Sequence, residues 1–432
     1  MEALTTLAKV DTGDTAWMLA ATALVLLMTP ALGLFYAGLV RSKNTLNTFM
    51  MSIAAIAVAT VTWALIGYSF AFSEGNDIIG GFDYAFLKDV NFEPLPGQTI
   101  PHLVFFAFQA TFCIITTALV SGAVVERMRF PAFLVFAALW SVLVYGVLAH
   151  WGFGPGWLFN GGTLDFAGGI AVEMASGFSA LAAALVVGAR KDYGRQALLP
   201  HNTVYVLLGA GLLWFGWFGF NGGSGFGTGT NSQLAFTNTL LCPAACLLMW
   251  FLLDALRGRR VTAVGAATAI IVGCVGITPA GGFVSPGYAL LLGALVALPC
   301  YGLIAYRTRT RVDETLDVLA AHGIAGFTGI LFIGFFAQVD WGGADGLFYG
   351  NAEQLWDQVK AAVAAPAYAF GATYLLLRVL GALMPLRGPE RDEAQGMDVI
   401  HHGEEAYASG EGAILVSEST PAKTPVPVAD PG

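Results

Sequence analysis

The chain of 432 residues is 56% hydrophobic and only 11% charged, and its mean hydropathy is +0.68. Soluble domains are far more polar than this, so the composition indicates an integral membrane protein. The formal net charge of −9 argues against a nucleic-acid-binding protein.

Apolar stretches of membrane-spanning length recur along the whole chain. A helix needs about 20 mostly apolar residues to cross the hydrocarbon core of a bilayer. By this criterion we predict eleven membrane-spanning helices, over residues 17–40, 46–72, 102–123, 131–152, 166–188, 203–222, 234–256, 262–280, 288–306, 318–338 and 357–386. The expected fold class is therefore an all-α integral membrane protein.

The distribution of Lys and Arg predicts the orientation of this bundle. If the N-terminus is outside, eleven spans place the C-terminus in the cytoplasm. Of the 20 Lys and Arg residues, only Lys9, Lys88 and Lys360 then fall outside, and the other 17 lie on the cytoplasmic side. This excess follows the positive-inside rule, and the opposite orientation would invert it.

Two ionisable residues inside apolar spans, Glu173 and His322, indicate the position of a functional site. Each follows a carboxylate by eight residues, Asp165 in the first case and Glu314 in the second. Eight helical residues rise about 12 Å, so both side chains arrive near the bilayer midplane if the two segments enter from opposite faces. An ionisable residue at that depth usually belongs to a substrate or ion pathway.

The same two segments indicate an internal repeat. Spans 1–5 end with the element that contains Asp165 and Glu173, and spans 6–10 end with the element that contains Glu314 and His322. Because five is odd, the second set of five spans must run opposite to the first, as in transporters whose site lies between inverted repeats. We therefore expect an inverted five-plus-five repeat followed by one extra helix.

Several other features have simpler explanations. A single buried Glu or His is more often a structural group, and only the repeated spacing favours a function here. Asp254 is expected to pair with the arginines over residues 257–260. The five cysteines fall inside predicted spans and are expected to pack there: Cys113, Cys242, Cys246, Cys274 and Cys300. The sequence contains no nucleophile–base set, metal-ligand cluster or nucleotide-binding loop, so we expect neither an enzyme nor a bound metal or cofactor.

A series of motifs occurs in a fixed order between residues 14 and 412. They read DTAWMLAATALVLLMTPALGLFYAGLVRSKN, FQATFCIIT, ERMRF, LDFAGG, WFGFNGGS, GITPAGG, DVLAAHG and GMDVIHHGEEAY. In these motifs the chain resembles the ammonium transporter family (Amt/Mep/Rh), and in particular its bacterial Amt branch. The resemblance implies transport of ammonium, or of methylammonium, by a homotrimer in the plasma (inner) membrane. It also implies a PII-type regulatory protein as a partner on the cytoplasmic face.

The resemblance assigns roles to individual positions. The family's functional positions correspond here to Phe108, Phe153, Ser224 and Trp217 for outer recruitment of the cation, Phe112 and Phe220 for an aromatic gate, and Asp165, Glu173 and His322 for the pore and proton relay. Two positions depart from the family pattern. Phe153 stands where most members have Trp, which is the better cation–π partner. Glu173 stands where most members have the first of two histidines, although some fungal members also carry Glu.

The mechanism implied by the resemblance separates a proton from ammonium. The cation loses its proton near the outer mouth, ammonia crosses an apolar pore, and the proton follows along polar groups that include Glu173 and His322. The pair can be a carboxylate with an imidazolium or two neutral groups, and the sequence leaves both open. Two alternatives also stay open, an ammonium sensor with little flux and an Rh-like channel for neutral gas. We expect a membrane domain over 1–386, a cytoplasmic regulatory segment over 387–412 and a disordered tail over 413–432.

Overall fold

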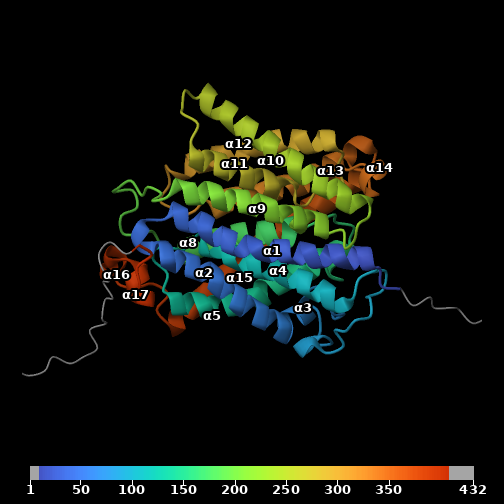
Figure 1. The fold of residues 1–432 in the computed structure, drawn as a ribbon, viewed down its shortest axis with the longest axis horizontal. Helices are drawn as coiled ribbons and strands as arrows, with labels where there is room; N and C mark the ends of the chain where they lie inside the picture. The colour runs from blue at the N-terminus through green and yellow to red at the C-terminus, as the bar shows by residue number, and fades with distance from the viewer. Residues whose placement is uncertain (1–8, 408–432) are drawn as a thin grey trace, which may run out of the picture.

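The structure, a computed structural model, describes residues 9–407. Within this range the chain is helical, with three isolated β-bridges and no strand. The long helices run side by side along the longest axis of the molecule (Figure 1). The expected tail over 413–432 and the end of the expected segment 387–412 lie outside the described residues.

Ten helices of the described range are long and apolar enough to cross a membrane. Some of them begin with, or are interrupted by, a short π-helical turn, labelled η2, η4, η5 or η6. In chain order they are α1 (Thr12–Leu39); α2 (Thr45–Thr62) with η2 (Trp63–Gly67) and α3 (Tyr68–Phe72); α4 (His102–Ser121); α5 (Phe130–Trp140) with η4 (Ser141–Tyr145), α6 (Gly146–Gly152) and α7 (Trp157–Asn160); η5 (Gly169–Met174) with α8 (Ala175–Val187); α9 (Thr203–Gly223); α10 (Thr230–Leu256); α12 (Pro286–Arg307); η6 (Leu319–Ile324) with α13 (Ala325–Phe336); and α15 (Ala352–Leu383). The short elements are the 3₁₀ turns η1 (Ser42–Asn44), η3 (Ala85–Leu87) and η7 (Leu347–Tyr349) and the helices α14 (Val339–Gly342), α16 (Glu390–Gln395) and α17 (Met397–His402).

The remaining predicted span, residues 262–280, contains a shorter helix than expected. This helix, α11 (Ala263–Ile277), has 15 residues. At 1.5 Å per residue it rises about 22 Å, less than the hydrocarbon core of about 30 Å. It begins at Thr262, whose side chain accepts a hydrogen bond from Gly265 N, and the chain passes into turns after Ile277. The number of eleven spans therefore stays a prediction.

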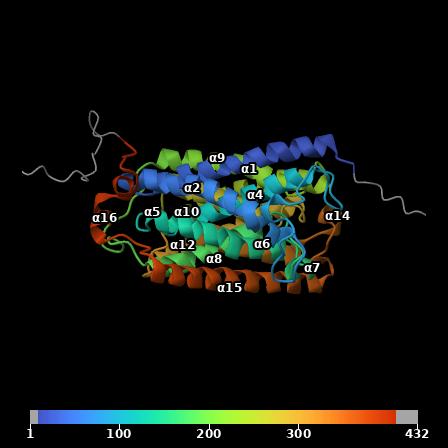
Figure 2. The same ribbon diagram turned by 90° about the horizontal axis from the view of Figure 1, so that it is seen from below.

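The described chain begins and ends at opposite ends of the bundle. The start of α1 lies at the same end as α14, whereas α16 and α17 lie at the other end, which we call the tail end (Figures 1 and 2). Helix α15 runs along one face of the bundle for nearly its whole length (Figure 2). A chain with an odd number of crossings must end on the side opposite to its start.

The segment that contains α16 and α17 is docked on the start of α2. Both oxygens of Asp398 accept backbone hydrogen bonds there, from Leu46 N at 3.0 Å and from Asn47 N at 2.7 Å. In return Asn44 Oδ1 accepts a hydrogen bond from Met397 N at 2.9 Å. The first N–H groups of a helix have no partner within the helix, so the Asp398 carboxylate acts as a cap from a distant part of the chain.

A buried ionic network joins four loops at the tail end. Arg190 lies between two carboxylates, with its Nη1 2.6 Å from Glu126 Oε2 and its Nε 2.8 Å from Asp313 Oδ2. Arg41 Nε lies 3.0 Å from Glu126 Oε1. Burial alone would raise the pKa of Glu126, but Arg190 and Arg41 outweigh it and hold that pKa below its usual range. The loops that follow α1, α4, α8 and α12 are thereby fixed relative to one another.

Asp254 is not part of this network. Its Oδ1 accepts a hydrogen bond from Tyr301 at 2.8 Å. Within the described residues its carboxylate lies within 4.0 Å of no Lys or Arg nitrogen, so the expected pairing with the arginines over residues 257–260 is wrong.

Candidate pore site

Two half-helices, η5–α8 and η6–α13, carry the ionisable pair, and each begins at a carboxylate. Asp165 accepts hydrogen bonds from three successive backbone N–H groups, those of residues 168–170, at 2.9, 2.7 and 2.7 Å. Glu314 accepts from the N–H groups of residues 318–319 at 3.0 and 3.2 Å. The two carboxylates therefore satisfy the free N–H groups at the starts of the half-helices.

The expectation that eight helical residues separate each carboxylate from its pathway residue is wrong. The π-helical turns begin only at Gly169 and at Leu319, so much of each intervening stretch is not helical. Gly168 has a φ of 121° and Asp317 a φ of 59°. Such left-handed backbone is not compatible with a continuous helix. The equal spacing of eight residues arises because Asp165 and Glu314 cap their half-helices in the same way, and not because eight helical residues follow each of them.

Glu173 and His322 are nevertheless brought together as the spacing predicted. His322 Nδ1 lies 2.8 Å from Glu173 Oε2, and the two side chains are 5% and 1% exposed respectively. The second carboxylate oxygen, Glu173 Oε1, has no hydrogen-bond partner among residues 9–407. A buried carboxylate oxygen without a donor is costly, so this atom is free to accept a proton or a hydrogen bond from a passing species.

Glycines allow the two half-helices to approach closely at this point. A Cβ on Gly177 would overlap the backbone of Gly323, which directly follows His322. A Cβ on Gly326 would lie 2.5 Å from Glu173 Cβ. Because no larger residue fits at these positions, the crossing of the half-helices determines where Glu173 and His322 meet.

A narrow apolar cavity leads to the pair from one side. Its volume is about 10 Å³, enough for about one water molecule. Apart from Glu173 and His322 its lining is Met28, Leu32, Phe35, Ile115, Leu119, Val172, Leu213, Trp217, Phe220 and Ile271. None of these ten side chains is charged, so an ion in this cavity would exchange its hydration shell for apolar walls.

The predicted gate residues lie at this cavity. The rings of Phe112 and Phe220 are stacked, with centroids 4.1 Å apart and planes inclined by 24°. Phe220 lines the cavity, as does Trp217, whose indole N–H donates to Thr278 Oγ1 at 2.8 Å. Phe220 belongs both to the stack and to the wall of the cavity, so the stacked rings border the cavity.

The predicted recruitment residues gather around the same stack. Phe153 is partly exposed, and its ring meets that of Phe112 edge to face, with centroids 6.2 Å apart. Ser224 Oγ donates to Phe220 O at 2.8 Å, which leaves its oxygen lone pairs free to accept. Phe108 is fully buried, with its ring 4.8 Å from that of Phe112.

The burial of Phe108 was not predictable from hydropathy or periodicity. The ring of Phe226 packs 6.0 Å from it, edge to face. Phe226 has a φ of 53°, unusual for an aromatic residue, and it lies in the turn after α9. Periodicity does not report such a turn. Contact of Phe108 with a cation from solution would therefore require Phe226 to move.

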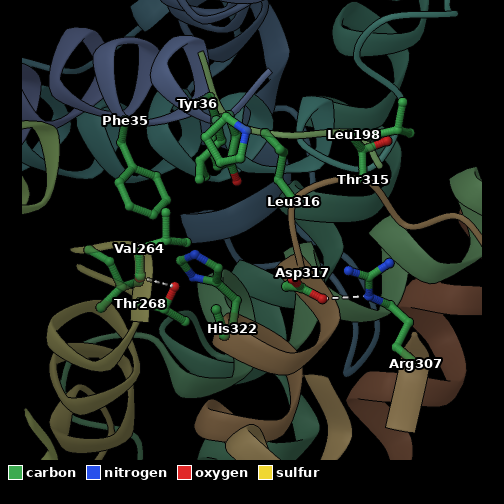
Figure 3. Close-up of a pocket in the computed structure, with 14 residues that line it drawn as sticks. Phe35, Tyr36, Leu198, Val264, Thr268, Arg307, Thr315, Leu316, Asp317 and His322 are labelled. Atoms are coloured by element: carbon green, nitrogen blue, oxygen red, sulfur yellow. Dashed lines mark hydrogen bonds and ion pairs between the residues drawn. The ribbon is translucent and has the colours of Figure 1, made fainter. Parts of the chain in front are cut away.

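His322 also lines a wider vestibule, together with Arg307 and Asp317 (Figure 3). This vestibule lies toward the tail end, because its lining includes Leu39 at the end of α1 and Leu198 in the loop before α9. This vestibule has a volume of about 190 Å³ and contains an ion pair, with Arg307 Nε 2.5 Å from Asp317 Oδ1. Burial raises the pKa of Asp317, although Arg307 opposes this effect. Asp317 was not predicted from the sequence as a site residue, although this residue opens the DVLAAHG motif that ends on His322 and Gly323.

The arrangement defines a class of protein. It is a multi-pass helical membrane protein in which a small, mostly apolar cavity beside two stacked rings contains a buried ionisable pair, and one member of this pair also lines a wider vestibule. Among residues 9–407 no group of three or more His, Cys, Asp and Glu side chains gathers in a way that would hold a metal ion.

Comparison with known proteins identifies the family. A sequence model described as Ammonium Transporter Family matches residues 16–407. The chain is 44% identical over 399 residues to a protein of Bacillus subtilis (strain 168) named ammonium transporter, covering 91% of this chain and 98% of that relative. The fold is similar to the crystal structure of Candida albicans Mep2, with a TM-score of 0.82, 35% identity and coverage of 86% and 84%. It is also similar to the structure of a sensor Amt protein, with a TM-score of 0.84, 27% identity and coverage of 90% and 98%. The chain belongs to the ammonium transporter family.

Proposed function

We propose that this protein transports ammonium by separating it into ammonia and a proton. Phe153 and Ser224 recruit the cation at the outer mouth, and Phe108 joins them when Phe226 moves aside, with Trp217 nearby. The stacked gate rings then open to admit ammonia to the narrow cavity. The proton passes along a relay of Glu173 and His322, while Asp165 holds the first half-helix and stabilises the positive charge nearby, so transport is electrogenic.

A deprotonation step would make the transport of ammonium selective against potassium. Ammonium and potassium have the same charge and nearly the same size, so an open cation pore would pass both. Only ammonium can give up a proton and continue as a neutral molecule. Potassium keeps its charge and would lose its hydration on entering apolar walls.

The observation that carries the proposal is the geometry of the path. A stack of two rings borders, through Phe220, a cavity of about 10 Å³ whose lining includes Glu173 and His322. This space suits a single neutral ammonia better than a hydrated ion. A proton has two adjacent positions here. One is the free Glu173 Oε1, and the other is the hydrogen bond between Glu173 Oε2 and His322 Nδ1.

The architecture that we propose around this path has eleven spans. The N-terminus is outside, the tail end is cytoplasmic, and two inverted sets of five spans are followed by α15. The positions of α1 and of α16 and α17 at opposite ends of the bundle agree with this topology. The membrane domain covers 1–386 and the regulatory segment 387–412. The protein acts as a homotrimer in the plasma (inner) membrane, with methylammonium as a second substrate and a PII-type protein as a cytoplasmic partner.

A second candidate function is an ammonium sensor with little flux. Its support is the similarity to the structure titled as a sensor Amt protein. A third, an Rh-like channel for neutral gas, would need no relay and would carry no current. The three functions differ in the charge that they move.

The test is the current evoked by ammonium in proteoliposomes that contain the full chain. We expect a current with ammonium, a smaller one with methylammonium and none with potassium. Ammonium binding without current would favour the sensor, and ammonia flux without current would favour the gas channel. A potassium current equal to the ammonium current would refute the deprotonation step.

A further inference from the structure

We propose that Phe226 is a movable cover over the ring of Phe108, and that Asp14 is the positioning residue that holds this cover closed. Phe226 lies between α9 and α10, in the turn over residues 224–229. The inference deepens the proposed function and rests on it, because it takes Phe108 as a recruitment residue and adds a step before the cation reaches this ring.

The contacts of Phe226 show what it covers. Its ring centroid lies 5.0 Å from that of Phe105 and 6.0 Å from that of Phe108, edge to face in the second case. Phe108 is fully buried and Phe105 is nearly so, whereas Phe226 is only half-buried. Phe226 is therefore the outermost of the three rings, and its displacement uncovers Phe108.

The turn that carries Phe226 is built to move without disturbing the recruiting hydroxyl. Gly225 and Gly227 flank Phe226, and glycine adopts many backbone conformations at low cost. Phe226 itself has a φ of 53°, which costs an aromatic residue free energy and favours its release. Ser224 is instead held on α9, since its Oγ donates to Phe220 O at 2.8 Å. A displacement of the turn after Ser224 therefore leaves this side chain in place.

Asp14, near the start of α1, holds the turn in the closed position. Its Oδ1 accepts two hydrogen bonds from Thr228, one from the backbone N at 2.8 Å and one from Oγ1 at 2.9 Å. Its Oδ2 accepts from Thr99 Oγ1 at 2.6 Å, which fixes the direction of the carboxylate. A Cβ on Gly227 would lie 2.8 Å from Asp14 Cγ, so the carboxylate fits against the turn only because residue 227 is glycine.

The cover adds a conformational step to the recruitment of the cation. While the cover is closed, a cation at the outer mouth contacts only Phe153 and Ser224. Once the cover opens, the cation also reaches the face of the Phe108 ring. The apparent affinity for a ligand is reduced by the fraction of molecules in the competent state. Because the hydrogen bonds to Asp14 stabilise the closed state, their removal should raise the open fraction and strengthen apparent ammonium binding.

The first test measures the cover without any transport. Phe108→Cys is introduced into the full chain, and the rate at which a small cationic methanethiosulfonate modifies the new thiol reports how often it is uncovered. The chain without this substitution gives the background from the five natural cysteines, which are buried. One lost hydrogen bond shifts an equilibrium about fivefold, so Asp14→Ala should raise the rate at least about fivefold. Asp14→Asn keeps an acceptor oxygen for Thr228 and should restore most of the slow rate.

Two controls separate a cover from a general loosening of α1. Asp11 caps the same helix by accepting from Asp14 N at 2.8 Å, and within the described residues its side chain bonds to no residue of the turn. Asp11→Ala should therefore not change the labelling rate of Phe108→Cys. In Phe226→Ala the cover is missing, so labelling should be fast and a further Asp14→Ala should add nothing. The unfolding midpoint shows whether each variant is folded, and Thr228→Val, which removes only the Oγ1 hydrogen bond, replaces Asp14→Ala if the latter is unfolded.

The second measurement is the ammonium-evoked current with Phe108 intact. Asp14→Ala should lower the half-saturating ammonium concentration by up to about fivefold at an unchanged maximal current. Equal labelling rates with and without Asp14→Ala, a further gain from Asp14→Ala in Phe226→Ala, or a raised half-saturating concentration would overturn the proposal. Faster labelling with an unchanged half-saturating concentration would confirm the cover but remove Phe108 from recruitment. Faster labelling in a protein without ammonium current would confirm the cover and refute the proposed transport.

Discussion

Replacing Glu173 with Gln tests the relay with the smallest change of shape. Gln has nearly the volume of Glu, and its side-chain oxygen still reaches His322 Nδ1, 2.8 Å from the present carboxylate. A hydrogen bond to a charged partner contributes about 1.5–3 kcal/mol, against about 1 kcal/mol for a neutral pair. The loss of stability is therefore about 1 kcal/mol, which leaves the protein folded.

The effect on transport should be much larger than the effect on stability. An amide does not accept a proton at neutral pH, so the relay loses one of its two adjacent groups at the pore centre. A positioned proton-transfer group typically contributes about 10²–10⁴-fold to a rate. Because His322 remains, we expect the ammonium-evoked current of Glu173→Gln to fall at least about tenfold.

The assay compares the peak currents of proteoliposomes at matched protein density across pH. The control is Glu173→His, which restores the pair common in the family and should keep a current with a shifted pH profile, since two imidazoles can share one proton. The unfolding midpoint of each variant is measured in the same detergent. A Glu173→Gln current equal to that of the unmodified protein, with the same pH profile, would remove Glu173 from the relay.

The remaining predictions concern the outer mouth and the tail end. Phe153→Trp should halve the ammonium concentration for half-maximal current without raising the maximum, since a Trp ring adds about 0.5 kcal/mol of cation–π attraction. Ser224→Ala should raise that concentration about fivefold, because one hydrogen bond of about 1 kcal/mol is lost. The same half-saturating concentration in the unmodified protein and in both variants would contradict recruitment of the cation at these residues. Asp398→Asn weakens the cap on α2 by about 1 kcal/mol, so limited proteolysis should cut the segment after Leu383 faster and flux should fall. The lowered pKa of Glu126 predicts a contribution to stability that is full above its usual pKa of 4.5 and is lost as pH falls through the folded-state pKa. The unfolding midpoint of Glu126→Gln should therefore lose this acid dependence, and an unchanged pH profile would contradict it.

Composition and hydropathy were sufficient to predict a helical membrane bundle, but helix ends depended on polar residues that hydropathy ignores. The last span was predicted to start at residue 357, whereas α15 starts at Ala352. Asn351 caps this helix by accepting from Gln354 N. Gln354 is buried, and its Nε2 donates to Gly162 O at 3.0 Å. A scale that counts Glu353 and Gln354 as polar ends the predicted span short of this turn, although the Gln354 amide is satisfied inside the protein.

The pore pair was predictable because it repeats, while its surroundings were not. The spacing before Glu173 and His322 indicated that two equivalent segments meet, and the 2.8 Å contact agrees. The vestibule ion pair and the cover over Phe108 depend on left-handed residues, Asp317 and Phe226, in turns without periodicity. Such turns follow from tertiary packing rather than from local sequence preference.

The two carboxylates of the first half-helix look equivalent in the sequence, but their hydrogen bonds distinguish them. A helix that starts inside a membrane protein exposes N–H groups that hydrocarbon does not satisfy. Asp165 uses both oxygens to accept three of these N–H groups, so its charge is committed to holding the half-helix in place. Glu173 follows in the π-helical turn η5, a distortion that often marks functional positions, and keeps Oε1 free. A relay needs an acceptor that is not already occupied. Within this half-helix the proton therefore has its place on Glu173, while Asp165 supplies the fixed position and a negative charge nearby.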